Sequence, residues 1–168
     1  MLAYSAILIR TMEQGIFSRL YRRLSWILSS ASSHRPGPDP APSEVTSRYL
    51  PQSGHYAASN GRVKPRAFHP APSDHKTSLF RVQGLAERQI WELGDAYVIL
   101  PPGNALRARA ELSVSQITSV GLRVESAEPP PRHANIVDWP VEKHEWMSRA
   151  QELAAKAMLR LRGTHAAT

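Results

Sequence analysis

Cysteine is absent from this 168-residue chain. Without thiols the protein has no disulfide framework, no thiolate zinc site, no iron–sulfur cluster and no cysteine nucleophile. Long hydrophobic runs are also missing, because none approaches the roughly 18 residues that a membrane-spanning helix needs. The sequence contains no glycine-rich phosphate loop, dinucleotide fingerprint, HExxH, EF-hand loop or GxSxG elbow. No common enzyme class is therefore indicated by a motif.

The composition is that of one ordinary domain with an excess of positive charge. Hydrophobic residues make up 42% of the chain, which is enough to bury a core. Lysine and arginine number 21 against 14 acidic residues, a formal net charge of +7. This balance favours anionic partners such as nucleic acid, phosphate ligands or acidic membrane surfaces. The excess is spread thinly without a basic arm, so a slightly basic soluble surface is the plainer interpretation.

Proline clusters divide the chain. There are 14 prolines, four of them within 34–44, where they restrict the backbone and remove amide donors. We expect a basic amphipathic N-terminal segment over 1–33, a proline-rich linker over 34–44, an α+β domain over 45–162 and a flexible tail over 163–168.

Residues 14–30 predict a basic amphipathic helix. Its apolar residues recur at spacings of one, three and four, whereas Arg19, Arg22 and Arg23 fall mainly on the other side. Such a helix can lie on a membrane surface, occupy a groove of a protein partner or pack on its own domain. Its richness in Arg and Ser also fits a targeting peptide, and a true start at Met12 is a further alternative.

Cap and turn signals predict short strands mixed with helices in the 45–162 domain. We expect a strand over 77–82, a helix over 86–93 that ends at Gly94, a strand or continued helix over 97–100, a turn over 101–104, a helix from Ser113 or Ser115 through Val120, a strand over 122–124 and a helix from Pro140 to Gly163. The stretch 64–73 is expected to be an ordered surface loop. This mixture predicts a small α+β domain with a long C-terminal helix.

Cations and aromatic residues alternate at the start of this domain. Arginine binds phosphate through two parallel hydrogen bonds, and an aromatic ring can stack on a base, so the pattern fits a nucleotide or single-strand site. The residues expected to bind phosphate or a base are Arg48, Arg62, Lys64, Arg66, Arg81, Tyr56 and Phe68. The alternative is that these arginines are solvated and the aromatic rings anchor a loop to the core.

A second stretch, 129–140, combines a cation, an imidazole, an amide and a carboxylate. His133 is a candidate general acid or base because the ordinary pKa of histidine is near neutrality, and His55 is a second candidate proton carrier. Asp138 is expected to cap the final helix, with Trp139 as a packing anchor. The seven histidines show no metal-ligand spacing on a helix, so neither a metal nor a cofactor is predicted.

Four short sequence blocks of the domain are similar to blocks found in other proteins. They are RVKPRAF (62–68), SLFRV (78–82), GLRV (121–124) and RHANIVDWP (132–140), and the segment QELAAK (151–156) is similar too. Over about 45–162 the chain resembles a group of short, uncharacterised bacterial proteins. The resemblance implies a bacterial cytoplasmic domain, and it assigns no activity and no residue role.

Three hypotheses for the function follow. The first is an accessory protein that binds nucleic acid or a nucleotide-like anion through the cations and aromatic rings named above. The second is an enzyme acting on a nucleotide or RNA, with His133 and His55 moving protons and Arg48 and Arg81 holding phosphate. The third is a module that docks on a protein partner or a membrane surface through the helix expected over 14–30.

Overall fold

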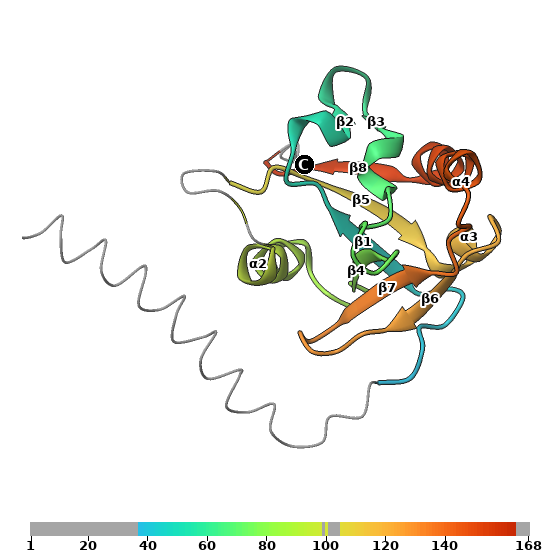
Figure 1. Cartoon of the computed structure of the whole chain (residues 1–168). Coiled ribbons are helices and arrows are strands. Elements are labelled where there is room, and N and C mark those ends of the chain that lie inside the picture. Colours follow the sequence, from blue (N-terminus) through green and yellow to red (C-terminus); the bar gives the residue numbers. More distant parts are fainter. Residues whose placement is uncertain (1–36, 99, 101–104, 164–168) are drawn as a thin grey trace, which may run out of the picture. The chain divides into compact units, whose positions relative to one another are not determined.

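The computed structural model describes residues 37–98, 100 and 105–163 (Figure 1). The chain divides into two units, Met1–Arg35 and Pro36–Thr168, and only the second falls within the described residues. The helix expected over 14–30 and the turn expected over 101–104 lie outside them. Among the described helices, none has the length and apolarity that crossing a membrane requires.

A six-stranded sheet forms the centre of the second unit (Figure 1). Its strands are β1 (Val45–Tyr49), β4 (Thr77–Arg81), β5 (Ala108–Ser113), β6 (Arg123–Ser126), β7 (His133–Val137) and β8 (Met158–Leu161). They lie in the order β6-β7-β4-β1-β5-β8, and every neighbouring pair is antiparallel. A small second sheet pairs β2 (Tyr56–Ala57) with β3 (Arg62–Val63).

Helices cover both faces of the large sheet. They are α2 (Glu87–Tyr97), α3 (Val114–Thr118) and α4 (Lys143–Lys156), with short 3₁₀ turns η1 (Ser53–His55), η2 (Ala58–Asn60) and η3 (Pro65–Phe68). Successive strand residues point to opposite faces. Leu79 accordingly belongs to a core cluster with α3 and α4, whereas Phe80 belongs to a second cluster with α2. The α+β class expected from the sequence is confirmed.

Two of the expected elements match closely. The strand expected over 77–82 is β4, Thr77–Arg81. The short helix begins at its expected cap, because Ser113 accepts a hydrogen bond from the Gln116 amide and the Gln116 side chain bonds back to Ser113. Gly121, with φ of 77°, lies in the left-handed region between this helix and β6.

Gly94 does not end a helix, and that prediction was wrong. It lies inside α2, which continues to Tyr97. A Cβ atom at this position would lie 2.6 Å from both the Tyr49 ring and Leu106 Cδ2. Glycine is therefore needed because the helix backbone packs directly against the Tyr49 ring, and not because a helix stops there.

The final helix was also predicted incorrectly at both ends. It begins after Glu142 rather than at Pro140, and it stops at Lys156. The residues after it form β8, which pairs with β5 and places Leu159 and Leu161 against the larger core cluster. Asp138 does not cap this helix; its φ is 63° and its carboxylate accepts a hydrogen bond from Arg123. Trp139 is buried, as expected.

Candidate functional site

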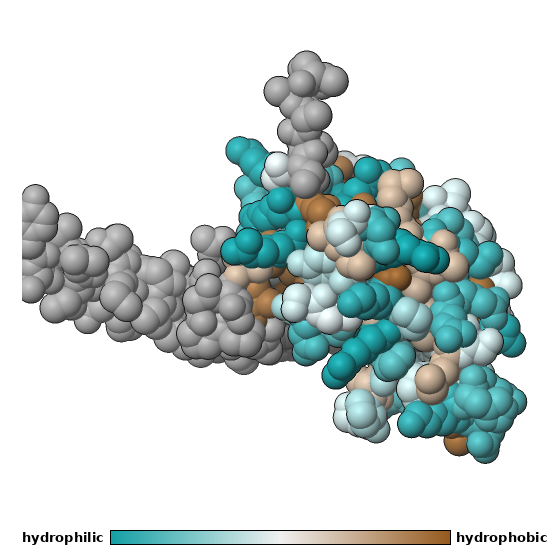
Figure 2. All heavy atoms as spheres, turned by 90° about the horizontal axis from the view of Figure 1, so that it is seen from above, coloured by the Kyte–Doolittle hydropathy of each residue, from teal (hydrophilic) through white to brown (hydrophobic). Residues whose placement is uncertain are grey.

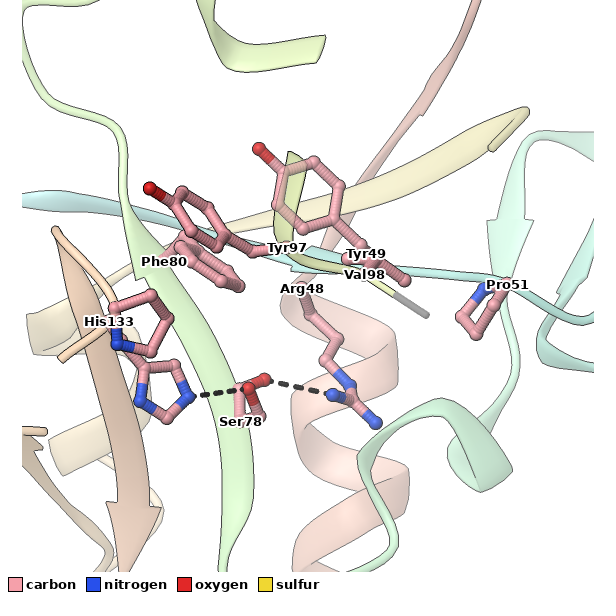
Figure 3. Close-up of a pocket in the computed structure, with 9 residues that line it drawn as sticks. Arg48, Tyr49, Pro51, Ser78, Phe80, Tyr97, Val98 and His133 are labelled. Atoms are coloured by element: carbon pink, nitrogen blue, oxygen red, sulfur yellow. Dashed lines mark hydrogen bonds between the residues drawn. The ribbon is translucent and has the colours of Figure 1, made fainter. Parts of the chain in front are cut away.

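A pocket of about 260 Å³ opens where β1, β4 and β7 meet the C-terminal end of α2 (Figure 3). Its wall is largely aromatic and aliphatic, with an arginine, a serine and a histidine among the lining side chains. The lining residues are Arg48, Tyr49, Pro51, Ser78, Phe80, Tyr97, Val98, Pro130 and His133. A mostly apolar cavity with a few convergent polar groups is the usual form of a ligand site.

Arg48 supplies the positive charge of this pocket. Its Nε–H donates to the Ala67 carbonyl at 3.1 Å, and Nη1 donates to the Ser78 carbonyl at 3.0 Å. Among the described residues it forms no ion pair. Burial lowers the pKa of Arg48 to about 10, so the guanidinium is still charged at neutral pH. A guanidinium has five N–H donors, and these two bonds leave three for a ligand.

Ser78 and His133 form the second polar element. Ser78 Oγ lies 2.8 Å from His133 Nε2, and His133 Nδ1 lies 3.0 Å from the Ala127 carbonyl oxygen. In Figure 3 the imidazole, the Ser78 side chain and the Arg48 guanidinium follow one another across the strands. The residues are far apart in the chain, and the pairing of β4 with both β1 and β7 brings them together.

Aromatic rings form the opposite wall. The Phe80 and Tyr97 rings are stacked, with centroids 6.2 Å apart and an interplanar angle of 17°. Phe80 is buried and also contacts the His133 ring, with centroids 5.4 Å apart. Tyr97 keeps 38% of its surface exposed, so its ring is available to a ligand. A planar group could stack there with its charge directed at Arg48.

A group of cations lies next to Arg48, on η1, η3 and the start of α4. We call Arg48, His55, Arg66, His69 and Lys143 the cationic cluster. Burial lowers the pKa of His55, and the charges of Arg48, Arg66 and His69 lower it further. Burial, Arg66 and Lys143 likewise lower the pKa of His69. Within the described residues the three permanent cations of this cluster form no ion pair, although Glu142 and Glu145 are close to Lys143 in the chain.

Arg62 and Lys64 extend this charge along β3. Both side chains are exposed, as is Arg66, and no described ion pair neutralises them. Figure 2 looks down on the end of the domain that carries β2 and β3, and shows a largely hydrophilic surface with scattered apolar side chains. The exposed cations expected from the sequence are therefore free to contact an anion.

Two of the predicted ligand-binding residues have structural roles that keep them from a ligand. Phe68 is fully buried in the larger core cluster, so its ring cannot stack on a base. Arg81 donates two hydrogen bonds to the Glu44 carboxylate, at 2.7 and 3.0 Å, and one to the Pro38 carbonyl. That prediction of phosphate binding is not supported, because the guanidinium is already neutralised. Tyr56 is half-buried and packs against the larger core cluster.

The two predicted proton carriers are separated. His133 lines the pocket with Arg48, whereas His55 is buried outside the lining residues, and its Nδ1 atom has no hydrogen-bond partner among the described residues. Sequence reasoning missed Ser78, Tyr97, His69 and Lys143. The sequence did contain a signal for Ser78. Side chains alternate between the two faces of a strand, so Ser78 lies on the face opposite to that of Thr77 and Leu79, which are buried.

No family model, curated protein or solved structure matches the chain. Among the described residues, no three histidine or carboxylate side chains come together as a metal site would require. The chemistry of the site therefore has to be argued from its own geometry.

Proposed function

We propose that the protein is a small cytoplasmic accessory protein that binds nucleic acid or a nucleotide-like anion. The phosphate would bind Arg48 in the pocket, and a base or another planar group would stack on Tyr97. Further phosphates of a longer ligand would reach the exposed cations Arg62, Lys64 and Arg66.

The unpaired charge of Arg48 carries this proposal. A guanidinium withdrawn from water without a carboxylate partner is costly to the folded state. Its two carbonyl contacts leave three N–H donors in a pocket. A bound phosphate would supply the missing countercharge in the bidentate geometry that arginine favours.

The cationic cluster supports a polyanion in particular. Eight ion-paired lysines and arginines occur elsewhere in the described domain, and they are Lys76, Arg81, Arg88, Arg109, Arg123, Arg149, Arg160 and Arg162. Around η3 and the start of α4, no carboxylate of the described residues forms an ion pair with Arg48, Arg66 or Lys143. Several phosphates in a row would neutralise such a surface, and affinity for them would depend steeply on salt.

Binding to a labelled single-stranded oligoribonucleotide tests the proposal. The full-length protein is titrated by fluorescence anisotropy, with a mononucleotide and a duplex as parallel ligands. Arg48→Met should weaken binding at least about tenfold, the loss expected for hydrogen bonds to a charged group. Arg88→Met is the matched control, because Arg88 is exposed and pairs only with Glu92 on its own helix. Equal affinity of Arg48→Met and the wild type would refute the proposed site.

A further inference from the structure

We propose that Ser78 is a nucleophile activated by His133, which would make the pocket a site of phosphoryl transfer from a phosphate ester. The inference deepens the proposed function, because the substrate would be the same phosphate group that Arg48 is proposed to bind.

The hydrogen bonds of His133 fix the direction of the proton between the two residues. The Ala127 carbonyl oxygen can only accept, so Nδ1 carries the hydrogen in that 3.0 Å bond. In the neutral imidazole Nε2 is then the acceptor, and the Ser78 hydroxyl donates to it over 2.8 Å. This is the arrangement in which an imidazole acts as general base toward a serine, with a third group orienting the ring.

The surroundings suit a phosphoryl group at Ser78. Arg48 donates to the backbone carbonyl of the same residue, and its side chain lines the same pocket as Ser78. Such a cation stabilises the charge on phosphate oxygens as the transition state forms. Asn135 is the cross-strand partner of Ser78 on β7, so its amide extends from the same face of the sheet as another donor. Ser78 is half-buried and lines the cavity, so a substrate can reach it.

The reaction balances without a further reagent. Ser78 Oγ forms a bond to phosphorus while its proton moves to His133 Nε2. The leaving group departs with the electron pair of the broken phosphorus–oxygen bond and takes up that proton. Water then attacks the phosphorus and gives a proton to His133, the bond from phosphorus to Ser78 Oγ breaks, Ser78 Oγ takes that proton from His133, and the phosphate product leaves.

A fluorophosphonate probe tests this step directly. Attack by Ser78 would break the phosphorus–fluorine bond and leave a stable phosphonyl adduct. The full-length protein is incubated with the probe, and the modified residue is found by peptide mass spectrometry. We expect one adduct, at Ser78, that forms about 100-fold faster than in His133→Gln, the usual size of a general-base contribution. His144→Gln is the matched control, because His144 is exposed on α4, and it should label as the wild type does.

An internal comparison keeps the test independent of any folding defect in the variant. Ser59 is exposed on η2, so in the wild-type protein it reports the labelling of an ordinary serine. Labelling of Ser78 no faster than Ser59, or equally fast in folded His133→Gln, would overturn the inference. Because the probe carries no nucleotide, labelling without oligonucleotide binding would refute only the proposed function. Binding without labelling would refute only the nucleophile.

Discussion

The central sheet holds two arginines in opposite electrostatic situations. Arg109 on β5 is fully buried, donates to the carboxylates of Glu87 and Glu111, and lies over the Trp91 ring at 5.3 Å. Arg48 on β1 has only two backbone carbonyls as described partners. Arg109 is fully buried and Arg48 is half-buried, but only Arg109 has its countercharge among the described residues. The comparison separates a charge that stabilises the structure from one that is available to a ligand.

The surroundings of each arginine repeat this difference. Near Arg109, Arg160 pairs with Glu111, and Arg162 pairs with Asp95. The Arg162 guanidinium also lies 5.4 Å from the centroid of the Trp91 ring. Burial alone would raise the pKa of Glu111, but hydrogen bonds from Arg160 and Arg109 bring it below its ordinary value. Near Arg48 the neighbours are further cations, which lower the pKa of His55 and His69 beyond the effect of burial. The charges around Arg109 are therefore balanced by carboxylates, whereas those around Arg48 are not.

Removing the buried cation should have the largest effect on stability. Arg109→Met takes the positive charge from between two carboxylates, and we expect it to lower the free energy of unfolding by about 3 kcal/mol. Arg48→Met removes the cost of an unpaired charge but also two hydrogen bonds to backbone carbonyls, so the two effects oppose each other and stability should change by less than about 1 kcal/mol. Urea unfolding followed by tryptophan fluorescence measures both. Equal losses would break the distinction between the two arginines.

The contact of α2 with the sheet gives a second, smaller effect. In Gly94→Ala the new Cβ would overlap the Tyr49 ring and Leu106, and overpacking of this kind costs about 1–3 kcal/mol. Gly54→Ala in η1 is the control, because nothing lies within 4 Å of a Cβ there. It should stay within about 0.5 kcal/mol of the wild type in the same unfolding experiment. If Gly94→Ala left the free energy of unfolding unchanged, α2 would have to be free to move away from β1.

The two histidines of the cationic cluster should give a still smaller effect, a dependence of the unfolding free energy on pH. The pKa of His55 and of His69 is lowered from 6.5, so the unfolded chain binds more protons than the folded one as the solution is acidified. Stability is therefore full above about pH 6.5 and falls as the pH drops through the lowered values. Unfolding free energies between about pH 8 and 5 should show this slope, and His55→Gln combined with His69→Gln should flatten it. Stability that rises toward acid would contradict the assigned direction.

Local signals were sufficient for part of the fold. The Ser113 cap with Gln116 and the apolar run over 77–82 depend on neighbours in the chain, and both predictions are confirmed. The strand β5 was missed because one of its buried positions is the charged residue Arg109, which interrupts the apolar pattern of a strand. Its carboxylate partner Glu87 is 22 residues away in the chain. The role of Gly94 was misread for the same reason, since its contact with Tyr49 comes from tertiary packing.

The candidate site depends even more on distant pairing. Arg48 and His133 were each predicted as candidate residues from their chemistry. Ser78, which connects them, lies 30 and 55 residues away in the chain. The pairing of β4 with its two neighbours brings the three residues to one pocket, where Arg48 contacts the backbone carbonyl of Ser78 and His133 contacts its hydroxyl. Composition could therefore suggest an anion-binding surface, but it could not place the pocket on it.

Two charge-matched double variants test most directly the claim that the unpaired cations bind the ligand. Arg66→Ala with Lys143→Ala removes two cations of the cationic cluster. Arg88→Ala with Arg149→Ala removes two that pair with Glu92 and Glu152, so the net charge falls equally. Binding of a single-stranded oligoribonucleotide is measured from about 50 to 200 mM salt. We predict that the first pair weakens binding and lowers the salt slope by about 1.4, two phosphate contacts at about 0.7 each, while the second pair leaves the slope unchanged. Equal losses in both variants would show that only total charge matters, and would contradict the account.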